Sequence, residues 1–151
     1  MDKNQLSVLA ANIISIKPLF YKTLGKPMPS NSDITPGAYY LMLYLKKHHS
    51  LSMSELGKML LISKPNVTAL VNKLIAKGFV ERSSDKQDRR IIMISLSEKG
   101  NQFVEKSNKK YLEYTKKRLL SLTDAELELF SNSLQHVKDI LSKIRTTDTN
   151  E

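Results

Sequence analysis

The sequence predicts a mainly α fold with a small β wing. Over most of its 151 residues, apolar side chains recur at steps of three and four, the period of a helix with one buried stripe. Two short helical patterns near the middle follow each other closely, and a single β-branched run, RIIMISL at residues 90–96, stands apart from them. A chain of this length can bury a core without disulfides or metals, so we expect one domain spanning residues 1–151.

The composition favours a polyanionic partner and excludes thiol chemistry. The net charge is +9, and clustered Lys and Arg gain free energy by displacing counterions from phosphates. Residues 119–151 carry a net charge of −3, so the positive charge ends before the last predicted helix. With no cysteine, the chain lacks thiolate catalysis, thiol redox sensing and Cys-containing zinc sites. No apolar stretch approaches the roughly 18 residues of a membrane span, and the N-terminus lacks a signal-peptide pattern, so we expect a cytoplasmic protein that binds no membrane.

The first part of the chain predicts two helices separated by one long loop. A helix is expected over residues 1–24, where Pro18 forces a kink or a restart. Its apolar stripe includes Leu6, Leu9 and Ile13. Residues 25–37 are rich in Gly, Pro, Ser and Asn and therefore predict a loop. Thr35 and Pro36 then predict the cap and the first-turn proline of a second helix.

The middle of the chain carries the signals of a helix-turn-helix. Ser52 and Glu55 form a capping box at the start of a short third helix. Ser63 and Pro65 open a fourth helix, which ends at Gly78. The side of the fourth helix that faces inward carries Val67, Leu70, Val71 and Leu74. Two short helices joined by a tight turn are typical of a helix-turn-helix.

A basic hairpin follows the fourth helix. After Gly78 the period changes from helix to strand, and FVER leads through the polar segment SSDKQDR into the RIIMISL run. The connection is too long for a two-residue turn, so its tip is expected to project as a basic finger that carries Lys86, Arg89 and Arg90. A helix-turn-helix followed by a basic hairpin is a winged helix, and residues 35–100 are therefore predicted to form a DNA-binding lobe.

Long helices are predicted in the last third, because neither Gly nor Pro follows the first hundred residues. One runs from Ser97 to about Leu120, and Thr123 opens the last helix with a second capping box. The last helix has apolar residues at alternating steps of three and four: Leu127, Phe130, Leu134, Val137, Leu141 and Ile144. Such a seam requires a partner helix. We therefore expect residues 1–24 and 101–145 of two copies to form a helical dimerisation platform.

The segment from the fourth helix through the hairpin resembles the MarR family (multiple antibiotic resistance regulators). The family pattern is Asp-x-Arg, then a strand, then Leu-Thr-x-x-Gly, and it matches Asp88, Arg90, Leu96, Ser97 and Gly100. Ser97 replaces the usual Thr and caps a helix about as well. The order of elements is similar over nearly the whole chain. The resemblance implies a homodimeric winged-helix regulator in which the first and last helices form the platform and small effectors bind between the platform and the DNA-binding lobe.

The fourth helix is interpreted as the recognition helix. The face opposite its apolar side, with the two flanks, carries Lys64, Pro65, Asn66, Thr68, Ala69, Asn72 and Lys73. Short polar side chains suit the base edges of the major groove, where Asn and Thr can form hydrogen bonds. Ser63 and the first N–H groups of the helix can hold a phosphate. The alternative is a helix face that contacts only solvent.

For the wing, the resemblance implies that Asp88 braces the arginines and that Arg90 reaches the minor groove. A narrow A·T-rich minor groove concentrates negative potential and attracts a guanidinium. Lys86 and Arg89 are expected on phosphates, which position a protein without reading sequence. The alternative is that Asp88 and Arg90 form only an exposed pair, worth under ~1 kcal/mol.

An effector cavity and a metal site are less well indicated. Four tyrosines come from elements that flank the effector cavity in the family: Tyr39, Tyr40, Tyr111 and Tyr114. Aromatic residues at helical spacing more often belong to a core. His48 and His49 are adjacent, so they point in different directions, form a poor metal pair and are expected to end the second helix. We therefore expect no metal and no cofactor, and the absence of cysteine excludes the branch of the family that senses peroxide through thiols.

The sequence thus predicts a homodimeric regulator that binds a pseudo-palindromic operator in double-stranded DNA, most simply a repressor released by a small-molecule effector. Enzymatic function is disfavoured, because the chain has no Gly-rich phosphate loop, nucleophile elbow or HExxH motif. Two alternatives remain open. One is an architectural protein that binds DNA without sequence preference, and the other is a basic helical module that binds an acidic protein.

Overall fold

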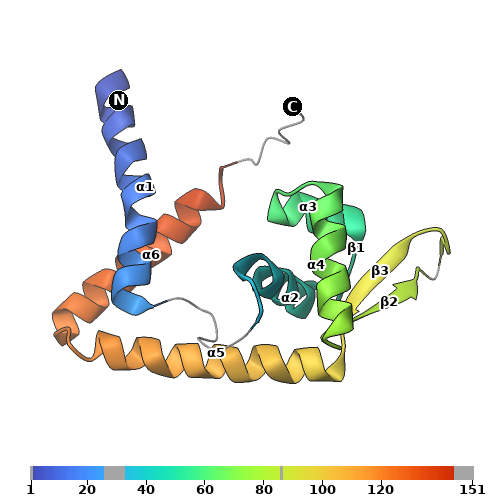
Figure 1. Ribbon diagram of the computed structural model, residues 1–151. Coiled ribbons are helices and arrows are strands. Elements are labelled where there is room, and N and C mark those ends of the chain that lie inside the picture. The colour runs from blue at the N-terminus through green and yellow to red at the C-terminus, as the bar shows by residue number, and fades with distance from the viewer. Residues whose placement is uncertain (1, 26–32, 86, 145–151) are drawn as a thin grey trace. The chain divides into compact units, whose positions relative to one another are not determined.

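A computed structural model describes residues 2–25, 33–85 and 87–144 (Figure 1). Its elements are α1 (Lys3–Leu24), α2 (Pro36–His48), β1 (Ser50–Ser52), α3 (Met53–Leu60), α4 (Lys64–Ala76), β2 (Val80–Ser84), β3 (Ile92–Leu96), α5 (Glu98–Leu119) and α6 (Asp124–Leu141). They divide into two compact units. One, here called the lobe, is residues 25–113, and the other, the platform, combines residues 1–24 with residues 114–151. The prediction of a mainly α fold with a small β wing is confirmed.

The lobe is built around a three-stranded antiparallel sheet with β3 in the centre, in the order β1-β3-β2. Ile94 in the middle of β3 pairs with Leu51 of β1 on one side and with Arg82 of β2 on the other. β2 and β3 were predicted from the sequence, whereas β1 was not. In the part of the chain that the structure describes, the buried apolar residues all belong to this lobe: Ile34, Ala38, Tyr39, Leu41, Met42, Leu45, Leu51, Leu56, Val67, Val71, Leu74, Val80, Ile94 and Val104.

The helix starts predicted at Thr35 and Ser52 have the expected caps. The hydroxyl of Thr35 accepts a hydrogen bond from the Ala38 N–H and opens α2. Ser52 and Glu55 form both halves of the capping box at the start of α3. Leu70 of α4, which was expected to face inward with Val67, is only half-buried.

A tight junction fixes where α5 leaves the sheet. The hydroxyl of Ser97 donates to the Gly78 carbonyl at 2.6 Å and accepts from the Gly100 N–H at 3.0 Å. Gly78 has a φ of 72°, a left-handed conformation that favours glycine. At Gly100 an added Cβ would overlap the carbonyl oxygen of Phe79. These contacts give a physical reason for serine and glycine in the pattern that follows the wing.

In the platform, two expectations require correction. α1 continues through Pro18 to Leu24, so the expected restart is wrong: proline removes only its own N–H from the ladder, and the helix continues beyond it. α6 ends at Leu141, and Ile144 lies beyond it. The chain there tightens into turns, in which the Ile144 N–H bonds to the Leu141 carbonyl. The last position of the predicted seam is therefore not helical. Within the described segments, no helix is long and apolar enough to cross a membrane.

Candidate nucleic-acid interface

The outer face of α4 is polar and accessible. Val67, Val71 and Leu74 are buried against the lobe core, which turns the opposite side of the helix to solvent. The residues predicted for DNA contact lie on that side or its flanks; Ser63, Lys64, Pro65, Asn66, Asn72 and Lys73 are exposed, and Thr68 is half-buried. The face therefore combines short polar groups with positive charge at both ends of the helix.

The start of α4 leaves its N-cap hydroxyl available. Ser63 occupies the N-cap position in extended geometry, yet its side chain makes no capping hydrogen bond within the described residues. The carbonyl of Ser63 accepts from the Val67 N–H at 3.0 Å. The N-terminus of a helix carries partial positive charge and N–H groups that lack helical partners. A hydroxyl and these N–H groups together can receive a phosphate oxygen.

The wing tip is ordered by two aspartates. The side chain of Asp85 accepts hydrogen bonds from the N–H groups of Gln87 and Asp88, at 2.8 and 3.0 Å. Asp88 in turn accepts from the side-chain Nε and Nη2 of Arg90, at 3.1 and 3.0 Å, and from its backbone N–H. This two-point contact orients a guanidinium that is otherwise 90% exposed. Arg89 is also exposed, and Lys86 lies outside the described residues.

The Asp88 contact shifts both ionisation equilibria. The hydrogen bonds from Arg90 lower the pKa of the Asp88 carboxyl below its ordinary value. The same contact raises the pKa of Arg90 above its ordinary value. Both groups therefore keep opposite charges at neutral pH, and the arginine is held in one orientation while most of its surface faces solvent.

A link between α4 and the wing was missed by the sequence analysis. Nη2 of Arg82, on β2, donates to Oδ1 of Asn72, on α4, at 2.6 Å. Strand alternation offered a signal, because Arg82 lies two residues after the buried Val80 and so points toward the same side of the sheet. The contact joins the recognition helix to the wing within the lobe.

The four predicted effector residues have different surroundings. Tyr39 is buried in the lobe core, its hydroxyl bonds to Oδ1 of Asn108 at 2.9 Å, and burial raises its pKa. Tyr111 donates to the carbonyl of Gly25 at 3.4 Å. Tyr40 and Tyr114 are partly exposed. The surroundings of Tyr39 are those of a core residue, which was the alternative reading of these tyrosines.

The histidines of α2 end the helix as expected. His48 is its last residue, and His49 follows as the C-cap with a φ of 65°. Among the residues that the structure describes, no group of three His, Asp or Glu side chains is placed to hold a metal ion.

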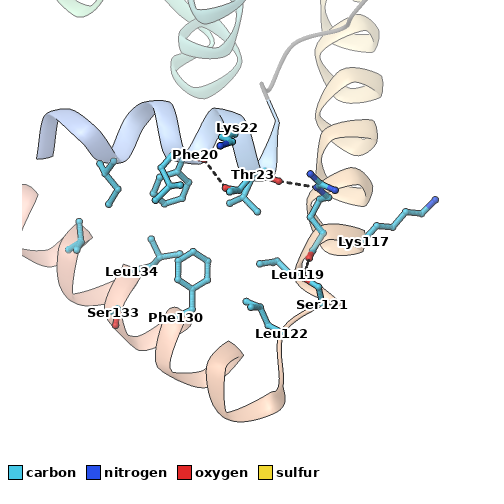
Figure 2. A pocket seen from close by; sticks show the side chains of 15 residues that line it. Phe20, Lys22, Thr23, Lys117, Leu119, Ser121, Leu122, Phe130, Ser133 and Leu134 are labelled. Atoms are coloured by element: carbon cyan, nitrogen blue, oxygen red, sulfur yellow. Dashed lines mark hydrogen bonds between the residues drawn. The ribbon is translucent and has the colours of Figure 1, made fainter. Parts of the chain in front are cut away.

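The platform has a large apolar cavity of its own. Figure 2 shows it between the end of α1, the end of α5 and α6, and its volume is about 760 Å³. Phe20 and Phe130 stack across it with their ring centroids 6.4 Å apart, and Nε of Arg118 donates to the Thr23 carbonyl at its edge. The lining includes the predicted dimer residues Phe130, Leu134 and Val137.

The residues predicted for the dimer interface form exposed or half-buried apolar stripes. Among the described residues of α1 and α6, none is buried. Leu6 is 56% and Val137 46% exposed, and the stripe continues through Leu9, Ile13, Leu127, Phe130, Leu134 and Leu141. The two helices thus expose apolar side chains that their own unit does not cover.

These features define a winged helix-turn-helix protein, with an open recognition helix and a basic wing in one lobe. The sequence model of the MarR family matches residues 32–91. The chain is 31% identical, over 105 residues, to the HTH-type transcriptional regulator YpoP of Bacillus subtilis (strain 168). The matched region covers 67% of this chain and 74% of that protein. The chain belongs to the MarR family of DNA-binding transcriptional regulators.

Solved structures agree on the fold. A MarR family protein from Bacillus stearothermophilus superimposes with a TM-score of 0.77 at 22% identity, covering 95% of this chain and 99% of that chain. A mutant MarR from E. coli, complexed with operator DNA, gives a TM-score of 0.64 at 22% identity and covers 91% and 99%.

Proposed function

We propose that the protein is a homodimeric, sequence-specific repressor that binds a pseudo-palindromic operator and is released by a small-molecule effector. The observation that carries the proposal is the joint exposure, in one lobe, of the polar face of α4 and of an arginine held at the wing tip by Asp88. The solved E. coli MarR with operator DNA supports double-stranded DNA as the partner.

In this proposal α4 enters the major groove and Arg90 enters the minor groove beside it. Thr68 and Asn72 lie four residues apart, so they present successive turns of one helix face to the base edges. Ser63, Lys64 and Arg89 bind phosphates, which fix the position of the helix. Asp88 keeps the guanidinium of Arg90 in one orientation before DNA arrives, which lowers the entropy lost on binding.

The dimer supplies the second half-site. A second copy is the proposed cover for the exposed stripes of α1 and α6, because a single chain leaves them in water. Side chains of the second copy would fill part of the cavity beside Phe130 and Val137. Two recognition helices about 34 Å apart would then meet successive turns of the same face of a duplex.

Release by an effector requires a ligand with different affinities for the DNA-bound and DNA-free states. The proposed effector contacts are Tyr40, Tyr111 and Tyr114, whose rings are apolar and whose hydroxyls are polar. Tyr39 would join them only if the lobe core rearranged to expose its side chain. A ligand that binds both states equally would leave the DNA affinity unchanged.

Footprinting the purified protein on DNA upstream of its own gene tests the proposal. We expect a protected inverted repeat whose half-sites are about one helical turn apart. The affinity should fall with salt at a log-log slope of about −0.9 per phosphate contacted, with preference over random DNA. Uniform protection at all concentrations would favour the architectural alternative, and no binding to any duplex would favour the protein-interaction alternative.

A further inference from the structure

We infer that Arg82 is a positioning residue for sequence readout: it fixes the amide of Asn72 so that only N–H donors face the DNA, which selects guanine over adenine at one position of each half-site. The inference rests on the proposed sequence-specific binding and adds the identity of one base. It is carried by a contact between two exposed side chains on the side of the lobe that is proposed to face DNA.

The contact determines which end of the amide faces the wing. Nη2 of Arg82 lies 2.6 Å from Oδ1 of Asn72. A guanidinium has only donors, so the amide end next to it must be the oxygen. The two ends of a planar amide point apart, and holding Oδ1 toward β2 leaves both N–H groups of Nδ2 on the other side. Asn72 thus offers two donors to a ligand, while its acceptor is engaged.

Thr68 and Ala69, the neighbours of Asn72 on the same helix face, have no free hydrogen-bond donor to offer a base. The hydroxyl of Thr68, one turn earlier, donates to the Lys64 carbonyl at 3.0 Å, so it has an acceptor oxygen and a methyl group left. Ala69, also exposed, contributes only a methyl group. The turn before Asn72 therefore offers apolar contact and one acceptor, through Thr68 and Ala69, whereas Asn72 offers donors.

The donor pattern decides between the two purines. Bidentate recognition of adenine by asparagine needs both amide ends, because adenine presents a donor at N6 beside the acceptor N7. Guanine presents two acceptors, O6 and N7, at the same place. An asparagine with its oxygen engaged satisfies guanine and meets the N6 donor of adenine with another donor. The positive charge of Arg82 acts in the same direction, because it also favours an acceptor edge.

The test is a selection of bound sites from randomised duplexes, followed by affinity measurements on duplexes that differ at one base pair. The full-length protein is compared with N72A, which identifies the position that Asn72 reads, and with R82M, which keeps the apolar stem but removes the donors. We expect guanine to be preferred over adenine at that position by roughly 5- to 140-fold in the wild type. In R82M the preference should disappear or reverse at that position alone.

Two further variants test whether the guanine preference depends on the donors of residue 82 and of residue 72. R82K retains a group that can only donate, so it should retain part of the guanine preference. N72D keeps the acceptor for Arg82 but loses both donors, so it should lose the guanine preference while Arg82 is intact. Thermal unfolding of R82M should match the wild type, because Arg82 is exposed.

The outcomes separate this inference from the proposed function. An enriched inverted repeat whose preference is unchanged in R82M would overturn the role of Arg82 and leave sequence-specific binding intact. A uniform loss of affinity at every base position in R82M would assign Arg82 to phosphate contact and also overturn it. If neither protein enriches any site, the proposed function fails, and this inference fails with it.

Discussion

The lobe and the platform differ in how many of their apolar side chains they bury within themselves. In the lobe, helices on one sheet bury Leu41, Met42 and Ile94 completely, and the core includes side chains from α2 through α5. In the platform, the described residues of α1 and α6 include no buried side chain, although the two helices are 22 and 18 residues long. The lobe therefore has the properties of a self-sufficient fold, whereas the platform leaves apolar stripes exposed that the proposed second copy would cover. Substitutions in the two units should fail in different ways.

The largest expected effect comes from breaking the platform. V137E places a charge in the exposed stripe of α6, which a single chain tolerates and a dimer interface does not. Loss of the second half-site removes the advantage of linked binding, so affinity for an inverted repeat should fall by about 10²- to 10⁴-fold. Sedimentation velocity should show the wild type at twice the 17.2-kDa mass of the chain and V137E at that mass.

The matched control lies on another side of α6. Leu129 is 69% exposed, and the helical period places it about 100° from the neighbouring seam residue Phe130. L129E should therefore remain dimeric. A wild type that sediments as a monomer at micromolar concentration, or a V137E that sediments like the wild type, would contradict the assignment of this stripe to the dimer.

The second effect tests the claim that the lobe is self-sufficient and closely packed. G100A adds a Cβ that overlaps the Phe79 carbonyl oxygen, a backbone atom that cannot move without displacing the junction between sheet and α5. We expect a loss of about 3 kcal/mol in the free energy of unfolding, measured by denaturant titration.

Gly37 provides the control for that substitution. Gly37 lies in the first turn of α2, and a Cβ there would approach only the two Cδ atoms of Leu70, at 3.5 and 4.0 Å. G37A should therefore be neutral or slightly stabilising, since alanine reduces the entropy of the unfolded chain. Equal stability of G100A and the wild type would show that the junction is looser than the contacts of Ser97 indicate.

The third effect separates DNA binding from folding within the lobe. R90A removes the guanidinium that Asp88 orients, so affinity for operator DNA should fall by about 1–3 kcal/mol while the thermal midpoint is unchanged. K109A, which removes the same charge from an exposed position of α5, should retain affinity within a few tenths of a kcal/mol. Equal losses in the two variants would mean that Arg90 contributes to binding only through the net charge of the protein. Full affinity of R90A would mean that Arg90 and the wing do not contribute to DNA binding.

Much of the fold could be predicted from the sequence, because the signals are local. The capping boxes at Ser52 and Thr123 specify helix starts within four residues of chain, and both occur in the structure. The change of period after Gly78 likewise marks the hairpin, since alternation and turn composition act over a few residues. The opposed faces of α4 followed from the helical period alone.

The features that could not be predicted depend on partners distant in sequence or on weak local preferences. β1 has only three residues, and its pairing with β3 defines it as a strand. The end of α6 before Ile144 has no glycine or proline to mark it. The bond between Arg82 and Asn72 requires the strand and the helix to be placed first. Contacts such as the one between Arg82 and Asn72 are therefore identified from the structure and not from the sequence.

The smallest expected effect is the pH-dependent stability contributed by the two capping boxes, one in each unit. In the lobe, hydrogen bonds from the backbone N–H and hydroxyl of Ser52 lower the pKa of Glu55 below its ordinary value of 4.5. In the platform, Thr123 lowers the pKa of Glu126 in the same way. A carboxyl with a lowered pKa in the folded state stabilises above its unfolded pKa, and this contribution is lost as the pH falls through the folded value.

E55Q and E126Q keep side chains that can complete a capping box but do not titrate. Each variant should be slightly less stable than the wild type at pH 7, and the difference should shrink as the pH falls below 4.5, as followed by denaturant titration across that range. Because the lobe is proposed to fold on its own whereas the platform requires a second copy, the unfolding transition that E126Q shifts should move with protein concentration, and the transition that E55Q shifts should not. A concentration dependence of both transitions would mean that the lobe and the platform unfold as one cooperative unit, and that the lobe is not self-sufficient.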